Sequence, residues 1–173
     1  MHRQASALTG LTLAAGLAAA LALPGAALAA SPEYAVIRMS QTVDRPAAEV
    51  WKKVGGWCDL GAWMKIDCTV TKGDGGIGSV RSIAGGRVTE IMVARTDLSY
   101  GYAQPPVEGR PYDLYHGFVE AKPVSARTSV LEYTLMYDVS GLPDAAARQA
   151  DMDRRRALFE GALRNMKALA EGK

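Results

Sequence analysis

The sequence has little of several residue types, and each scarcity excludes a class of protein. Its 173 residues include two histidines and two cysteines, and 20 lysines and arginines against 18 aspartates and glutamates give a formal net charge of +2. So small an excess leaves no electrostatic footprint for nucleic acid, and we expect no nucleic-acid partner. The densest basic run, Arg154–Arg156, has acidic neighbours such as Asp151 and Asp153 and is predicted to be a solvated helix face.

What the chain does contain describes one globular domain. Hydrophobic residues make up 49% and charged residues 22%, and seven tyrosines and three tryptophans supply bulk for a core. A disordered chain and a small disulfide-stapled scaffold both conflict with this composition. The length excludes two large domains.

The first 29 residues have the pattern of a secretory signal peptide. A basic N-terminus precedes the apolar run Leu11–Leu23, and small residues up to Ala29 mark the expected cleavage site. The alternative is an uncleaved membrane anchor, which the alanine-rich run and its break at Pro24 disfavour. We therefore expect residues 1–29 to be a leader and residues 30–173 to be a single exported domain, periplasmic or secreted.

Few metal-ligating side chains remain once this leader is removed. His116 is then the one histidine, which excludes a multi-histidine metal site. In an oxidising compartment Cys58 and Cys68 are expected to form a disulfide, while two free buried thiols or a metal pair are the alternatives. Two cysteines without a nearby histidine cannot complete a zinc shell, so we expect no metal and no diffusible cofactor.

Periodicity predicts the order of the elements. A helix follows Pro46 and ends before Gly55, a second short one covers Cys58–Met64, and a long amphipathic helix runs from Pro143 to Gly172. Alternating or apolar runs predict seven strands, at Tyr34–Val43, Ile66–Thr71, Ser79–Ala84, Arg87–Arg95, Leu98–Gln104, Tyr112–Ala121 and Thr128–Val139. The fold class is therefore α+β, with a seven-stranded curved antiparallel sheet and two short helices wrapped on a long C-terminal helix.

One hairpin can be placed in register from the sequence. The dipeptide Gly85-Gly86 is typical of a two-residue primed turn, and it places Arg81 opposite Glu90. One face of this hairpin then carries Ser79, Arg81, Ile83, Val88, Glu90 and Met92. If that face is inside, Arg81 and Glu90 form a polar anchor or ligand site; alternatively, the pair merely stabilises the register.

The last predicted strand divides into two faces, which is typical of a sheet with one apolar side. The polar face has Glu132, Thr134 and Asp138, and the apolar face has Leu131, Tyr133, Leu135, Tyr137 and Val139. The long C-terminal helix is the element of matching length to cover the apolar face, using a stripe that includes Met152, Phe159, Met166 and Leu169. His116 alternates with Tyr115, so it points to the surface if Tyr115 faces inward.

Several short motifs, taken together, resemble the START-like or SRPBCC superfamily. They are Asp44–Trp51, Trp57–Trp63, Gly78–Arg81, Val88–Ile91, Tyr100–Tyr102, Tyr115 and Ser129–Tyr133. Their order is similar to the branch called polyketide cyclase/dehydrase-like, over residues 34–170. The resemblance implies the helix-grip fold with a deep apolar cavity between sheet and long helix, and exported relatives often carry a cysteine pair where Cys58 and Cys68 fall.

The resemblance also directs attention to possible site residues. Relatives often have Trp-His-Pro where this chain has Trp63-Met64-Lys65, so a histidine for proton transfer is missing. Arg81 and Glu90 are the candidate catalytic residues. The expected ligand cavity is lined by Trp63, Arg81, Glu90, Met92, Tyr100, Tyr102, Tyr115, Tyr133, Leu135, Tyr137, Phe159 and Met166.

Three functions fit these observations. The first is an exported monomer that binds or carries a hydrophobic or amphipathic small molecule, lipid-like or polyketide-like, and contacts a membrane at most transiently. The second is a metal-free cyclase or dehydratase that acts on a polyketide-like or aromatic substrate. The third is a partner-binding envelope protein with a vestigial cavity. The thin acid–base equipment of the sequence favours the first.

Overall fold

The computed structural model describes residues 31–110 and 112–173, and the predicted leader lies outside them. Seven strands and three helices follow one another in the predicted order. They are β1 (Tyr34–Val43), α1 (Ala47–Val54), α2 (Leu60–Met64), β2 (Cys68–Lys72), β3 (Val80–Ile83), β4 (Val88–Thr96), β5 (Ser99–Ala103), β6 (Tyr115–Pro123), β7 (Ser129–Asp138) and α3 (Ala145–Glu171).

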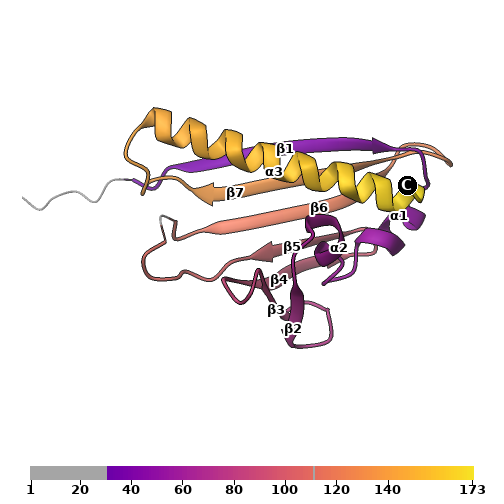
Figure 1. Cartoon of the computed structure of the whole chain (residues 1–173), viewed down its shortest axis with the longest axis horizontal. Helices are drawn as coiled ribbons and strands as arrows, with labels where there is room; N and C mark the ends of the chain where they lie inside the picture. Colours follow the sequence, from indigo (N-terminus) through magenta and orange to yellow (C-terminus); the bar gives the residue numbers. More distant parts are fainter. Residues whose placement is uncertain (1–30, 111) are drawn as a thin grey trace, which may run out of the picture.

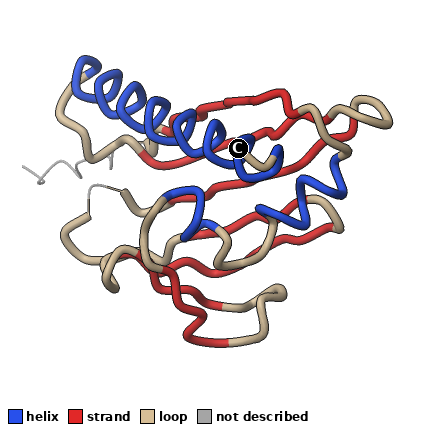
Figure 2. The backbone as a smooth tube through the Cα atoms, turned by 45° about the vertical axis from the view of Figure 1, so that its right-hand side comes forward, coloured by secondary structure: helices blue, strands red, loops and turns tan. Residues whose placement is uncertain are grey.

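The strands form one sheet in the order β1-β7-β6-β5-β4-β3-β2, and every neighbouring pair is antiparallel. The helix α3 lies along one face of this sheet, and α1 and α2 lie on the same side (Figure 1). Register shifts at Met92–Ala94 in β4 and Val70–Lys72 in β2 mark bulges, which bend a strand and increase its twist. The turned view in Figure 2 shows α3 in front of the upper part of the sheet, and the remaining strands extend below the helix. The predicted helix-grip architecture is confirmed.

The predicted register of the β3–β4 hairpin is also confirmed. Arg81 pairs with Glu90, and Ile83 pairs with Val88. Gly85 and Gly86 have φ angles of 68° and 84°, the positive values that a primed two-residue turn requires at both central positions. Local turn chemistry thus fixes which residues of these two strands face each other.

The side of the sheet that faces α3 is apolar, and the other side is half-exposed. In β7 the predicted inner residues from Leu131 to Tyr137 are all buried, while Thr134 on the opposite face is only partly covered. Tyr115 faces inward at 3% exposure, and His116 lies on the outer face beside Phe118 and Met136. The expected surface position of His116 therefore holds.

The long helix α3 lies within the predicted range Pro143–Gly172, and a cap marks each of its ends. The Asp144 side chain accepts a hydrogen bond from the Ala147 backbone N–H at 2.8 Å, and Gly172 ends the helix in the left-handed conformation with φ 75°. Phe159 and Met166 of the expected apolar stripe are buried, but Leu169 is 38% exposed. The stripe is displaced because Asp151 and Leu163 occupy the covered face instead.

The segment between α1 and β2 is held by a disulfide. Cys58, just before α2, is bonded to Cys68 at the start of β2, with their Cα atoms 5.5 Å apart. The predicted disulfide is therefore confirmed, and the alternatives of free thiols or a metal pair are excluded for these two cysteines. Within the ranges that the structure describes, no helix has the length and apolar character that crossing a bilayer would require.

Candidate functional site

A cavity of about 480 Å³ lies between α3, α2 and the concave face of the sheet. That volume is within the range of pockets that hold small organic ligands. Seven of the residues expected from the sequence line it: Trp63, Arg81, Glu90, Tyr102, Tyr115, Tyr133 and Phe159. The remaining wall comes from Leu60, Met64, Ile66, Ile83, Ala84, Val88, Gln104, Arg110, Tyr112, Leu142, Asp151, Arg154, Arg155 and Leu158.

The other five expected residues, Met92, Tyr100, Leu135, Tyr137 and Met166, are buried but do not line the cavity. Other side chains cover them. The rings of Trp51 and Trp57 pack against Tyr100 at centroid distances of 5.7 and 5.4 Å, and the guanidinium of Arg155 lies 4.3 Å from the centre of the Tyr137 ring. Alternation identifies an inward face, but it does not distinguish a cavity wall from the core behind it.

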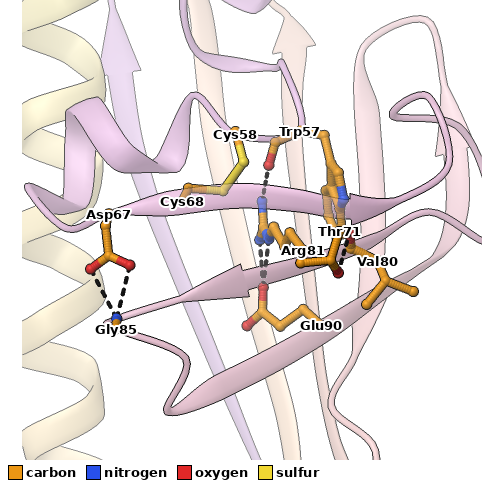
Figure 3. Close-up of a disulfide and its surroundings, with 9 residues drawn as sticks. All are labelled: Trp57, Cys58, Asp67, Cys68, Thr71, Val80, Arg81, Gly85 and Glu90. Carbon is orange, nitrogen blue, oxygen red and sulfur yellow. Dashed lines mark hydrogen bonds and ion pairs between the residues drawn. A yellow bond between two sulfur atoms is a disulfide. The ribbon is translucent and has the colours of Figure 1, made fainter.

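The polar centre of the cavity is the Arg81–Glu90 pair, drawn in Figure 3. Arg81 Nε and Nη2 donate to Glu90 Oε2 at 2.8 and 2.6 Å, and Arg81 Nη1 donates to the Trp57 carbonyl. The Trp57 ring stacks on the guanidinium, whose carbon is 3.8 Å from the ring centre. Both charged side chains are at most 4% exposed, so this is an internal anchor and not a surface ion pair.

The electrostatic surroundings keep Arg81 charged. Burial by itself would lower the pKa of Arg81, but the neighbouring oxygens of Tyr100 and Glu90 outweigh it and hold that pKa above its ordinary value. Both carboxylate oxygens of Glu90 are engaged, because its Oε1 also accepts a hydrogen bond, from Gln104 Nε2 at 3.1 Å. A carboxylate occupied in this way is poorly placed to accept a proton from a substrate.

The hydrogen-bond network continues from this pair toward the surface. The Tyr112 hydroxyl donates to Gln104 Oε1 at 3.0 Å, and Arg110 Nη1 donates to the Tyr112 hydroxyl at 2.7 Å. None of these three residues was predicted to belong to the site. Gln104 follows Tyr102 by one strand period, which was a usable signal, whereas Tyr112 was expected inside a strand but lies in the loop before β6.

A pair of buried tyrosine hydroxyls forms a second polar point in the wall. The Tyr102 and Tyr133 oxygens are 2.8 Å apart. Burial is the main cause that raises the pKa of both tyrosines well above the ordinary value, and nearby phenolic and acidic oxygens add to it. Burial likewise raises the pKa of Tyr115 to about 12. These hydroxyls are therefore protonated at neutral pH. Because one hydroxyl of the Tyr102–Tyr133 pair donates to the other, the pair has one O–H left to donate to a ligand.

The helix side of the cavity carries a charged cluster that corrects a prediction. Asp151 was expected on a solvated face, but it is 5% exposed and forms ion pairs with Arg154 and Arg155. Burial would raise the pKa of Asp151, yet the hydrogen bond and charge of Arg155, together with the charge of Arg154, lower it overall. The i, i+3 and i, i+4 spacing on one helix turn allows both pairs.

This arrangement is better suited to binding than to proton transfer. The tyrosines and arginines supply hydrogen-bond donors, and the carboxylates of Glu90 and Asp151 are occupied by arginines. His116 lies on the opposite face of the sheet and cannot reach the cavity. The apolar walls would exclude water from around a bound ligand.

Comparison with known proteins identifies the family to which this sequence belongs. A family model described as polyketide cyclase/dehydrase and lipid transport matches residues 34–171. The chain belongs to this family. Its members have the START-like, or SRPBCC, fold that the motifs indicated, and the match extends from the first strand to the end of α3. No curated protein sequence matches the chain.

Solved structures show the same fold in proteins of low sequence identity. A protein from Thermobifida fusca is 22% identical with a TM-score of 0.67, covering 79% of this chain and 93% of that one. The protein Ara h 8.0201 is 15% identical with a TM-score of 0.62, covering 82% of this chain and 100% of that one. The di-domain ARO/CYC protein BexL, from the BE-7585A biosynthetic pathway, is 17% identical with a TM-score of 0.64, covering 79% of this chain and 46% of that one.

Proposed function

We propose that this protein binds or carries a hydrophobic or amphipathic small molecule, lipid-like or polyketide-like, in the cavity between the sheet and α3. The observation that carries the proposal is the cavity itself, about 480 Å³ in volume with apolar walls such as Ile83 and Phe159. A protein whose function was only to dock a partner would have no need to leave this interior unfilled, because a cavity costs packing free energy. The description of the family includes lipid transport, which supports the same conclusion.

A matched pair of substitutions tests where a ligand binds. Val88 lines the cavity, whereas Val36 lies on the outer face and is 44% exposed. With the neutral fluorescent dye Nile red as the probe, we expect the wild-type protein to bind one dye molecule. Val88→Trp should abolish that binding by filling the cavity, and Val36→Trp should retain it. Binding that survives Val88→Trp would place the dye elsewhere and contradict the proposal.

Native mass spectrometry of the protein purified from its own exported fraction would name the ligand class. A stoichiometric adduct that is released on denaturation is the expected result, and the same spectrum reports whether the protein is a monomer. The mass also tests export. Together with the leader pattern, the Cys58–Cys68 disulfide supports an oxidising compartment, so the chain should begin at Ala30. A chain that still begins at Met1 would contradict the predicted cleavage.

A cyclase or dehydratase is the second candidate, favoured by the convergence of Arg81 and the Tyr102–Tyr133 hydroxyl pair on one cavity. Such donors could hold an enolate oxygen. The distinguishing experiment uses Arg81→Lys with a substrate found by screening aromatic polyketides. Loss of turnover with binding retained would favour the enzyme, and loss of binding alone would favour the carrier.

A further inference from the structure

The charges that line the cavity are unbalanced. Four arginines and two carboxylates contribute to its wall, which leaves an excess of two positive charges. Glu90 neutralises Arg81, and Asp151 neutralises one of the two helix arginines that it contacts. Arg110 has no carboxylate within ion-pair distance among the residues that the structure describes.

The excess lies at one end of the cavity. The neutral Arg81–Glu90 pair is deep, with the Arg81 side chain 1% exposed. The Arg154 side chain is 71% exposed, and its cavity neighbour Leu158 is 54% exposed, so this part of the wall forms the mouth. Arg110 is half-buried in the loop before β6 and lines the same cavity. Its guanidinium carbon and that of Arg155 lie 5.8 and 5.6 Å from the centre of the Tyr112 ring, so Arg110 is on the side of the helix arginines. Among the residues that line the cavity, polarity therefore grades from a charge-neutral interior to a mouth, or rim, with more arginines than carboxylates.

Contacts within the protein hold the rim arginines in place but do not use all of their hydrogen-bond donors. Arg110 donates through Nη1 to Tyr112 and through Nη2 to the Arg87 carbonyl, and its remaining N–H donors are free of hydrogen-bond partners within residues 31–110 and 112–173. Arg155 is held by Asp151 and by stacking on the Tyr115 and Tyr137 rings. Arg154 shares the Asp151 carboxylate with it, so its long exposed side chain can turn to a ligand while Asp151 stays paired.

We propose that the ligand is an amphipathic anion, with an apolar body inside the cavity and an acidic headgroup such as a carboxylate held at the mouth by Arg110 and Arg154. This inference rests on the proposed function and narrows it to a ligand class. Charge-assisted hydrogen bonds from guanidinium to carboxylate are about twice as strong as those between neutral groups. A neutral analogue of the same shape fills the interior equally well but leaves the rim hydrated.

The test compares a dansyl-labelled fatty acid with its methyl ester, which differ in charge but hardly in apolar surface. Fluorescence titration of the wild-type protein should give an affinity for the acid about tenfold higher than for the ester. In the double variant Arg110→Gln/Arg154→Gln, the preference for the acid over the ester should disappear, so that the two affinities become equal. Added salt should weaken binding of the acid alone.

The matched control is Arg127→Gln. Arg127 is an exposed arginine in the β6–β7 hairpin, so this variant should keep the preference for the acid. Equal affinities of wild-type protein for acid and ester would overturn the inference and leave the proposed function standing. Failure of both probes to bind would overturn the two together. If the double variant loses only its binding to phosphatidylglycerol vesicles, the rim is a membrane contact and the inference is wrong.

Discussion

At the scale of single residues, the buried Arg81–Glu90 pair is a feature with a large energetic consequence. Each charge is tolerated inside the protein because the other is 2.6 Å away and because the Trp57 carbonyl and the Gln104 amide each add a hydrogen bond to the pair. Removing one partner leaves the other charge buried without compensation, which costs more than the pair itself contributes.

Glu90→Gln should therefore lower the free energy of unfolding by about 3–5 kcal/mol, because the Arg81 guanidinium would stay buried without its anion. Urea denaturation measures this loss. The matched control is Glu132→Gln, which breaks a pair with Lys122 whose two side chains are 42% and 53% exposed and should cost about 0–1 kcal/mol. Equal effects of the two substitutions would show that Arg81 finds compensation elsewhere.

A second residue-scale prediction concerns Gly117 in β6. A Cβ built there would lie 2.2 Å from the Tyr102 ring, so the ring occupies space that is open because residue 117 has no side chain. Gly117→Ala should displace Tyr102, break its hydrogen bond to Tyr133 and destabilise the fold by about 1–3 kcal/mol.

The control for Gly117→Ala is Gly161→Ala in α3, where the nearest atom to the added Cβ is Arg164 Nη2 at 3.7 Å. With room for a methyl group in a helix, this change should stabilise the fold by about 0.5–1 kcal/mol. Thermal denaturation of both variants shows whether each substitution raises or lowers the stability of the fold. A Gly117→Ala protein as stable as the wild type would mean that the Tyr102 ring can move at no cost.

At the scale of elements, the disulfide determines the position of one cavity wall. Met64 and Ile66 line the cavity and lie between Cys58 and Cys68, so the bridge closes the segment that carries them. The Asn165 side chain fastens the same segment to α3 by donating to the Trp63 carbonyl at 2.8 Å. The helix α2 has five residues and is too short to hold this position by its own hydrogen bonds.

Reduction of this disulfide should lower the free energy of unfolding by about 2–3 kcal/mol, the entropy effect of releasing a loop of this length. Urea denaturation with and without a reductant measures the change, and the double variant Cys58→Ser/Cys68→Ser serves as a control that should not respond to the reductant. If the reduced protein is as stable as the oxidised one, the segment is held by packing alone.

At the scale of the whole molecule, five tyrosines on the covered side of the sheet link its stability to alkaline pH. Burial is the largest cause that raises the pKa of Tyr100, Tyr102, Tyr115, Tyr133 and Tyr137 above 10.0. Because these pKa values are higher in the folded state, their contribution to stability is complete below pH 10. It is lost as the pH rises through the folded values, of which that of Tyr115 is about 12.

We therefore expect most of the tyrosinate absorbance to appear in one step with alkaline unfolding, above the pH at which the urea-unfolded chain titrates. Tyr115→Phe should move the alkaline unfolding to higher pH, because one ionisation that drives it is gone. The control Tyr34→Phe removes a ring that is 50% exposed and should not move it. Gradual ionisation near pH 10 without unfolding would contradict the burial of these rings.

The sequence by itself determined the features that depend on neighbours along the chain. The β3–β4 register followed from the conformational freedom of Gly85 and Gly86, the inward face of β7 from its period-two alternation, and the extent of α3 from its amphipathic pattern. Family motifs spread over the chain added the cavity between the sheet and the long helix. These features are visible in sequence because local backbone chemistry or a repeating pattern encodes them.

Only the tertiary structure decided which inward residues line the cavity and what charge it carries. Asp151 is buried because α3 meets the tyrosines of β6 and β7, and Arg110 reaches the rim because the loop before β6 folds over the β3–β4 turn. Such contacts join segments far apart in sequence, and they depend on helix rotation and side-chain rotamers that no periodicity records. The lining and the charge of the cavity therefore depend on contacts between distant segments, whereas the fold follows from local sequence patterns.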